Sequence, residues 1–118
     1  MTHPRYLAAD GGFLRDEAPA EMYEMAARCG VTHFVVPGNK PDVVERYRKL
    51  LQQELDHPIF LMPGIGSQGG QIADAFRSTL GCASYAIVGR AIYKAEDITA
   101  AAEKLCAEAL GFEKEVQQ

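Results

Sequence analysis

The chain has 118 residues, which is enough for one domain with a hydrophobic core. Hydrophobic residues make up 47% of it and charged residues 24%, the profile of a soluble globular protein. Its net charge of −4 argues against a nucleic-acid-binding surface, and no apolar run approaches the roughly 20 residues needed to cross a bilayer.

The first 16 residues carry little periodicity, apart from a turn signal at Asp10-Gly11-Gly12. Residues 17–29 have helical periodicity, and Gly30 is placed to end that helix. We expect its buried face to carry Met22, Met25 or Ala26, and Cys29.

A strand is predicted over residues 31–36, followed by a helix that begins at Pro41, where the missing N–H of proline costs nothing. The buried stripe of this helix is expected to contain Val44, Tyr47, Leu51 and Leu55. A second strand is predicted over residues 59–62, and the helix after it passes through Phe76 and ends near Gly81.

The last strand is predicted over residues 85–88 and is followed by a short helical turn at residues 91–95. Asp97 is typical of the cap of a final helix, with Gly111 as its stop. The inward positions of that helix are expected to be Ile98, Ala101, Leu105 and Ala109.

The strand ends repeat at a fixed interval. The segments Val-Val-Pro-Gly, Leu-Met-Pro-Gly and Ile-Val-Gly-Arg begin at residues 35, 61 and 87, so 26 residues separate each from the next. Strand, loop and helix repeating at that length indicate an α/β chain with a parallel sheet, either open or part of a (β/α)₈ barrel. Because a whole barrel takes about 250 residues, we predict one domain, residues 1–118, that forms about half of a barrel and covers roughly strands 6–8.

Residues 62–70, Met-Pro-Gly-Ile-Gly-Ser-Gln-Gly-Gly, lie between a predicted strand and a predicted helix. Glycines there let the backbone approach a ligand closely, and a helix start attracts anions, most often phosphate. Arg90 follows the next strand end and offers a fork of donors suited to phosphate oxygens. The plainer alternative is two glycine-rich turns and a surface arginine.

Pro-Gly-Ile-Gly-Ser-Gln-Gly-Gly at residues 63–70, together with Val-Gly-Arg-Ala-Ile-Tyr at residues 88–93, resembles the C-terminal part of orotidine 5'-phosphate decarboxylase. The run at residues 35–41 resembles the preceding strand end of that family, and the match continues to about Leu110. The resemblance implies that Gln68 and Arg90, with the backbone of Gly69 and Gly89, bind the phosphate of the nucleotide. The N–H groups near Gly69 and Gly70 are expected to face the same anion.

The resemblance also implies a site for the pyrimidine end of the nucleotide. In that family the loop that begins at the position of Pro63 closes over the base. Thr2-His3-Pro4 is similar to a Ser-His-Pro segment of archaeal members, whose hydroxyl contacts the pyrimidine ring, so Thr2 is a candidate too. The alternative for residues 1–4 is a terminus without a role.

The family's catalytic set, Asp-x-Lys-x-x-Asp, is absent from this sequence. Lys40, Lys49 and Lys94 have no carboxylates at the matching spacing, so we assign no catalytic residue. The histidines at positions 3, 33 and 57 are not spaced for a metal site, and we expect neither a metal nor a cofactor.

The three cysteines, Cys29, Cys82 and Cys106, are widely spaced and form no Cys-x-x-Cys pair. We expect them to be reduced, partly buried thiols in a cytoplasmic protein, since no signal peptide is recognisable either.

Three functions compete at this stage. The first is the phosphate-binding half of an orotidine 5'-phosphate decarboxylase, which converts orotidine monophosphate to uridine monophosphate and CO₂ in pyrimidine synthesis. We expect that half to be inactive without its N-terminal counterpart. The second is a non-catalytic half-barrel that binds phosphates or self-associates, and the third is another phosphosugar barrel enzyme such as hexulose-phosphate synthase. The expected partners are a nucleotide monophosphate or other phosphate ligand and either a second copy or a complementary N-terminal half, with no nucleic acid and no membrane.

Overall fold

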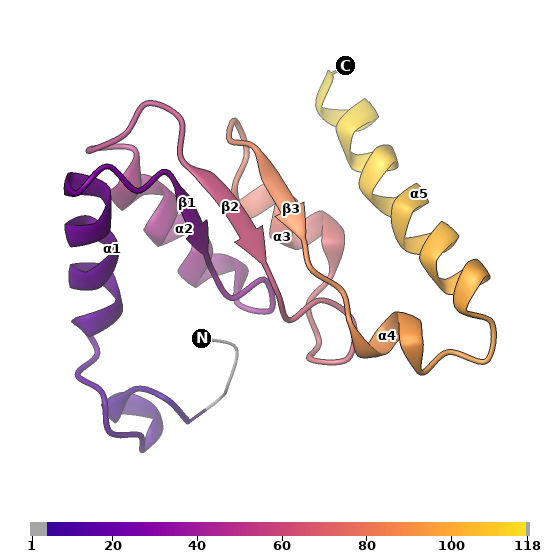
Figure 1. Cartoon of the computed structure of the whole chain (residues 1–118), viewed down its shortest axis with the longest axis horizontal. Helices are drawn as coiled ribbons and strands as arrows, with labels where there is room; N and C mark the ends of the chain where they lie inside the picture. Colours follow the sequence, from indigo (N-terminus) through magenta and orange to yellow (C-terminus); the bar gives the residue numbers. More distant parts are fainter. Residues whose placement is uncertain (1–4, 118) are drawn as a thin grey trace.

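A computed structural model of the chain describes residues 5–117. Three parallel strands form its sheet in the order β1 (His33–Val35), β2 (Ile59–Met62) and β3 (Ser84–Ala86) (Figure 1). Phe34 pairs with Phe60, and Phe60 in turn pairs with Ser84. The predicted βα repeat and parallel sheet are confirmed, although β1 and β3 are shorter than the predicted strands.

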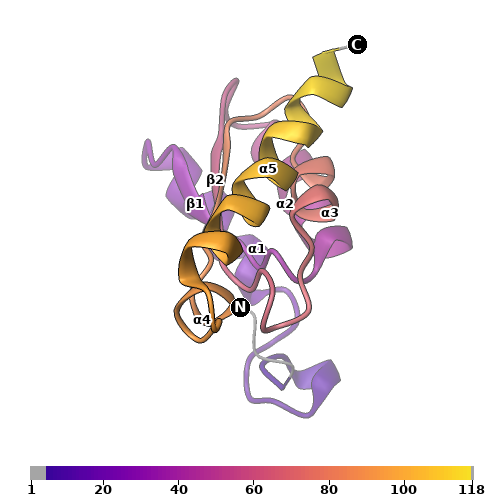
Figure 2. The ribbon, with the colours of Figure 1, turned by 90° about the vertical axis from the view of Figure 1, so that its right-hand side faces the viewer.

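The helical elements are η1 (Ala8–Asp10), α1 (Ala18–Arg28), α2 (Pro41–Leu51), α3 (Ile72–Ser78), α4 (Arg90–Tyr93) and α5 (Ile98–Gln117). Helices α2 and α3 return the chain from the end of one strand to the start of the next, and α4 and α5 follow β3. Figures 1 and 2 place α2 and α3 against one face of the sheet, with α1 beside α2 and α5 beside α3. Helices α2 and α3 therefore cover one face of the sheet. Helices α1 and α5 lie beyond them, α1 toward the side of β1 and α5 toward the side of β3.

The hydrophobic core lies between the sheet and α2 and α3. Phe34, Phe60 and Met62 point into it from the strands, and Val44 and Leu51 meet them from α2, all of them buried. The predicted stripe of α2 is thus confirmed for Val44 and Leu51, while Tyr47 is partly buried and Leu55 packs against the core from beyond the end of the helix. Burial of this kind contributes roughly 1.5–3 kcal/mol for each large apolar side chain, so it is the main source of stability of the fold.

The other face of the sheet has no layer over it among the described residues. Val35 and Tyr85 are 54% and 58% exposed, and Val31 and Ile87 are exposed as well. Alternate residues of the same strands are thus buried on the helix side and open on the other side, because side chains alternate across a strand. In a closed barrel this open face lines the interior.

The predicted buried face of α1 is wrong except at Ala26, which is partly buried against the core. Met22, Met25 and Cys29 are exposed, whereas Tyr23 and Ala27 face the rest of the chain. The Tyr23 hydroxyl donates a 2.6 Å hydrogen bond to the Val35 carbonyl, and its ring packs on Phe34 and Tyr47. This anchor fixes the rotation of α1 about its axis.

The predicted stop of the last helix at Gly111 is also wrong, because α5 continues to Gln117. Phe112 packs against Phe76 with ring centroids 5.9 Å apart and ring planes tilted by 58°, and the Arg77 guanidinium lies over the Phe112 ring. These contacts stabilise the part of α5 that follows Gly111. Asp97 does cap the helix, since its carboxylate accepts the Ala100 N–H at 2.9 Å, but Ile98 is exposed and not inward.

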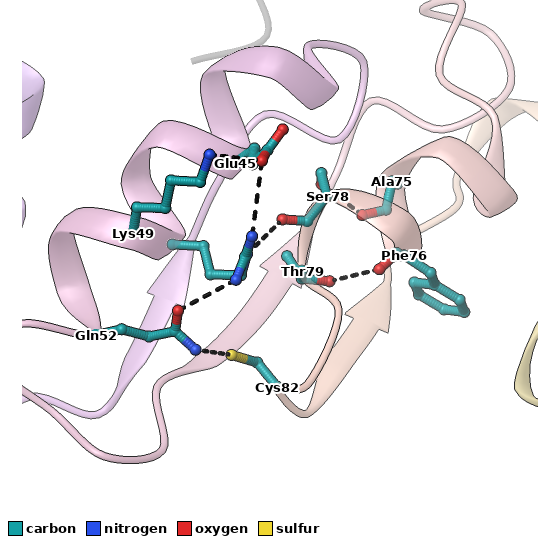
Figure 3. Close-up of polar contacts among 9 residues, drawn as sticks. Glu45, Lys49, Gln52, Ala75, Phe76, Ser78, Thr79 and Cys82 are labelled. Atoms are coloured by element: carbon teal, nitrogen blue, oxygen red, sulfur yellow. Dashed lines mark hydrogen bonds and ion pairs between the residues drawn. The ribbon is translucent and has the colours of Figure 1, made fainter. Parts of the chain in front are cut away.

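Arg48 joins α2 to the C-terminal end of α3 (Figure 3). Its side chain is 19% exposed, and its Nε donates to the Ser78 carbonyl at 3.0 Å. One Nη donates to Gln52 at 3.2 Å, and the Gln52 amide in turn contacts the Cys82 sulfur at 3.4 Å. Arg48 thereby satisfies a carbonyl that the end of α3 leaves open.

We expect Arg48→Met to lower the free energy of unfolding by about 1–3 kcal/mol, because it leaves the Ser78 carbonyl oxygen and the Gln52 side-chain oxygen without their donor. Arg46→Met is the matched control, since Arg46 is an exposed arginine on the same helix. Urea unfolding at one protein concentration measures both. Equal effects of the two substitutions would show that the Arg48 contacts contribute nothing.

Candidate phosphate-binding site

The loop after β2, residues 63–70, is closed by its own hydrogen bonds. Gly66 N–H donates to the Gly70 carbonyl at 2.8 Å, and Gly70 N–H donates to the Gly64 carbonyl at 3.1 Å. Gly64, Gly66 and Gly69 have φ values of 95°, 77° and 89°, a region that side chains other than glycine rarely adopt. Three of the four glycines that the sequence places here are therefore required by the backbone itself.

The glycine N–H groups of this loop are engaged within it. The N–H of Gly69 donates to the Gly66 carbonyl at 2.8 Å and that of Gly70 to Gly64, so neither points to an open site. Gln68 lies at the outer tip and is exposed. Among the described residues, the Ser67 and Gln68 N–H groups donate no hydrogen bond, and these groups and the Gln68 amide are the polar groups that the loop can offer to an anion.

Arg90 is the first residue of α4 and is exposed, directly after Gly89. A Cβ built on Gly66 would lie 2.6 Å from the Ala91 Cβ. The loop after β2 (the β2 loop, residues 63–70) is therefore in direct contact with the first turn of α4. Figure 1 shows both at the end of the sheet to which the strand arrows point. The structure thus brings the segments that carry Gln68 and Arg90 together at the C-terminal end of the sheet.

The loop after β1 supports the β2 loop from its other side. Gly38 N–H donates to the Pro63 carbonyl at 2.8 Å, and the Asn39 amide donates to the Gln68 carbonyl at 3.4 Å. A Cβ on Gly70 would lie 3.0 Å from the Gly38 carbonyl oxygen, so this close approach also depends on glycine. Sequence reasoning missed Asn39, although its place just after the first strand end of the 26-residue repeat was a usable signal.

Pro63, the candidate for the base end of a nucleotide, is half-buried at the start of the loop. Thr2 lies outside the residues that the structure describes.

A cavity of about 650 Å³ lies elsewhere, between residues 6–16, α1 and α2. Tyr23 and Tyr47 form part of its wall, and neither Gln68 nor Arg90 lines it. Burial raises the pKa of Tyr23 to about 12, which keeps its hydroxyl protonated as the donor to Val35. The wall of this cavity also carries the charged residues Asp10, Asp16, Lys40 and Arg46.

Over residues 5–117 no group of three or more His, Cys, Asp or Glu side chains could hold a metal ion. The His33 ring Nδ1 is 2.9 Å from the Thr32 hydroxyl, a local contact at the open sheet face.

The three cysteines are free, but Cys29 and Cys106 are exposed, so the expectation of partial burial holds only for Cys82. Burial raises the pKa of the Cys82 thiol, which makes it a poor nucleophile.

None of the helices in the described part of the chain combines the length and the apolar character that crossing a membrane requires.

The family model for orotidine 5'-phosphate decarboxylase / HUMPS proteins matches residues 9–105. The chain belongs to this family. The resemblance carried by the loops at residues 63–70 and 88–93 is therefore confirmed, and with it the assignment of the three βα units to about half of a (β/α)₈ barrel.

Archaeal members of the family are similar to the chain over most of its length. It is 36% identical over 110 residues to orotidine 5'-phosphate decarboxylase from Methanococcoides burtonii, and 38% identical over 110 residues to that from Methanosarcina barkeri. Each alignment covers 92% of this chain but only 45% and 44% of the respective relative. The chain thus spans about half the length of these relatives.

A solved structure gives the same proportion. The crystal structure of orotidine 5'-monophosphate decarboxylase from Methanocaldococcus jannaschii, complexed with the inhibitor BMP, is 27% identical and superposes with a TM-score of 0.70. The superposition covers 90% of this chain and 46% of that one.

We expect Gly66→Ala to destabilise the chain more than Gly69→Ala. Both place a side chain at positive φ, which costs roughly 1–2 kcal/mol, but only the Gly66 Cβ meets a neighbour, Ala91. The excess should disappear when Gly66→Ala is made in an Ala91→Gly background, as a double-mutant cycle by urea unfolding would measure. Equal costs for the two alanines, or an excess that survives Ala91→Gly, would contradict the contact between the β2 loop and α4.

Proposed function

We propose that the chain is the nucleotide-phosphate-binding half of an orotidine 5'-phosphate decarboxylase, which converts orotidine monophosphate to uridine monophosphate and CO₂ in pyrimidine synthesis. One observation carries the proposal: the loop that presents Gln68 packs on the first turn of α4, which presents Arg90, at the C-terminal end of a parallel sheet. Barrel enzymes often bind phosphate there, between the loops after their last two strands and a short extra helix. We accordingly assign β1, β2 and β3 to strands 6–8 of the barrel.

In this proposal Arg90 supplies a permanent positive charge and a fork of donors to the phosphate oxygens, and Gln68 supplies an amide donor from the opposite loop. Gly89 lets the backbone of the second loop approach the phosphate. Gly69 acts by turning the chain just after Gln68, since its own N–H bonds to Gly66. Pro63 and Thr2 are proposed to lie toward the base.

The reaction itself needs groups that this chain does not supply. Decarboxylation requires charges set against the departing carboxylate and an acid that protonates the ring carbon. The Asp-x-Lys-x-x-Asp motif that provides them in this family is absent from the sequence. We therefore propose that the chain binds the substrate phosphate and that an N-terminal half provides the chemistry, in the cytoplasm, where the free cysteines remain reduced.

The open face of the sheet favours the proposal that the chain binds a protein partner. The sheet exposes an apolar surface made by Val31, Val35, Tyr85 and Ile87. Among residues 5–117, the outer edges of β1 and β3 pair with no further strand. Such surfaces and edges are usually covered in stable proteins. A complementary N-terminal half would cover them, and so would a second copy related by a twofold axis, which is the basis of the alternative of a self-associating, non-catalytic half-barrel.

We expect Arg90→Ala to weaken the binding of uridine monophosphate about ten-fold or more, because a hydrogen bond to a charged group is worth roughly 1.5–3 kcal/mol. Arg46→Ala removes an exposed arginine of α2 and serves as the control for charge alone. Isothermal titration of the three proteins at low salt measures the effect. An Arg90→Ala protein that binds as tightly as the control would remove Arg90 from the site.

We also expect that the isolated chain does not remain a monomer. Two unpaired edges and an uncovered apolar face favour association at micromolar concentration. Light scattering coupled to size exclusion measures the mass directly. A stable, monodisperse species at the 12.9 kDa of one chain would contradict this expectation.

A further inference from the structure

The peptide unit that joins Gln68 to Gly69 is held at both of its polar groups. Its N–H, that of Gly69, donates to the Gly66 carbonyl at 2.8 Å from within the loop. Its carbonyl, that of Gln68, accepts the Asn39 amide at 3.4 Å from the loop after β1. The orientation of this peptide unit affects where the exposed Gln68 side chain points. The reason is that the side chain is attached to the Gln68 Cα, the atom bonded directly to the carbonyl carbon of this unit.

Asn39 is itself placed by a well-fixed segment. The preceding residues Pro37 and Gly38 are buried, and Gly38 N–H donates to the Pro63 carbonyl at 2.8 Å. The Lys40 N–H closes a turn on the Pro37 carbonyl at 2.9 Å. A Cβ on Gly70 would lie 3.2 Å from the Asn39 Cα, so the two loops touch along their backbones as well.

We propose that Asn39 is a positioning residue for the phosphate site: its amide holds the Gln68–Gly69 peptide so that the Gln68 side chain faces the anion. The inference rests on the proposed function for the identity of the ligand, a nucleoside monophosphate, but the hold on the loop does not depend on that ligand. Asn39 comes from a different βα unit than Gln68, so it couples the first strand end to the site formed by the second and third. It acts through Gln68 and is not itself assigned a contact with the phosphate.

Asn39→Ala tests this role, with Gln53→Ala as the control because Gln53 is an exposed amide beyond the end of α2. The first readout is amide hydrogen exchange of the chain without ligand. A typical net hydrogen bond is worth a factor of roughly two to ten, so exchange at Gly66 and Gly69 should accelerate about that much in Asn39→Ala and not in the control. Unchanged exchange at both glycines would overturn the proposal.

The second readout is the affinity for uridine monophosphate in a double-mutant cycle. Asn39→Ala should weaken binding roughly three- to ten-fold in the wild-type background but less than about two-fold in a Gln68→Ala background, since the side chain it positions is then gone. Asn39→Asp, which keeps the shape but loses the donor, should weaken binding at least as much as Asn39→Ala. Equal effects of Asn39→Ala in both backgrounds would contradict action through Gln68.

The outcomes also separate this inference from the proposed function. If Gln68→Ala and Arg90→Ala weaken binding but Asn39→Ala behaves like Gln53→Ala, the inference fails and the phosphate site stands. If neither Gln68→Ala nor Arg90→Ala changes binding, the proposed function fails, and the exchange of Gly66 and Gly69 still decides whether Asn39 holds the loop.

Discussion

The structure depends on one constraint: within residues 5–117, the three parallel strands are covered by helices on one face only. Phe34, Phe60 and Met62 pack against α2 and α3, and the alternate residues Val35 and Tyr85 lie open on the other side. A parallel sheet is normally covered on both faces. Because side chains alternate between the two faces of a strand, the strands that bury one set of side chains in the core must expose the other set on the open face. This arrangement fits a chain that spans about half the length of its relatives.

The strand register also builds the site. Parallel pairing brings the three carboxyl ends to one edge, so that segments 26 residues apart in sequence become neighbours. Glycines then let the backbones meet. Gly70 approaches the Gly38 carbonyl, and Gly66 approaches Ala91 in α4. The resulting contacts run from the loop after β1, through the loop that carries Gln68, to the helix that begins with Arg90.

The repeat and the glycine loop could be predicted from the sequence because each is a local pattern. Strand ends at a constant spacing specify a βα array, and the loop at residues 63–70 specifies the family. The errors concern tertiary contacts that no local pattern reveals. The rotation of α1 is set by the Tyr23 hydroxyl on Val35, and α5 continues past Gly111 because Phe112 packs on Phe76. For Asn39 the place after a strand end was a usable signal, but its partner, the Gln68 carbonyl, lies 29 residues away and could not be predicted.

The proposed function is tested most directly by mixing this chain with the N-terminal half of a related enzyme, such as that of Methanosarcina barkeri, chosen to contain the Asp-x-Lys-x-x-Asp motif. We expect the two halves to form a one-to-one complex that decarboxylates orotidine monophosphate, whereas neither half does so alone. We also expect Val35 and Tyr85 to become protected from solvent in that complex. Turnover that follows this chain alone through purification, or two folded halves that never associate, would contradict the proposal.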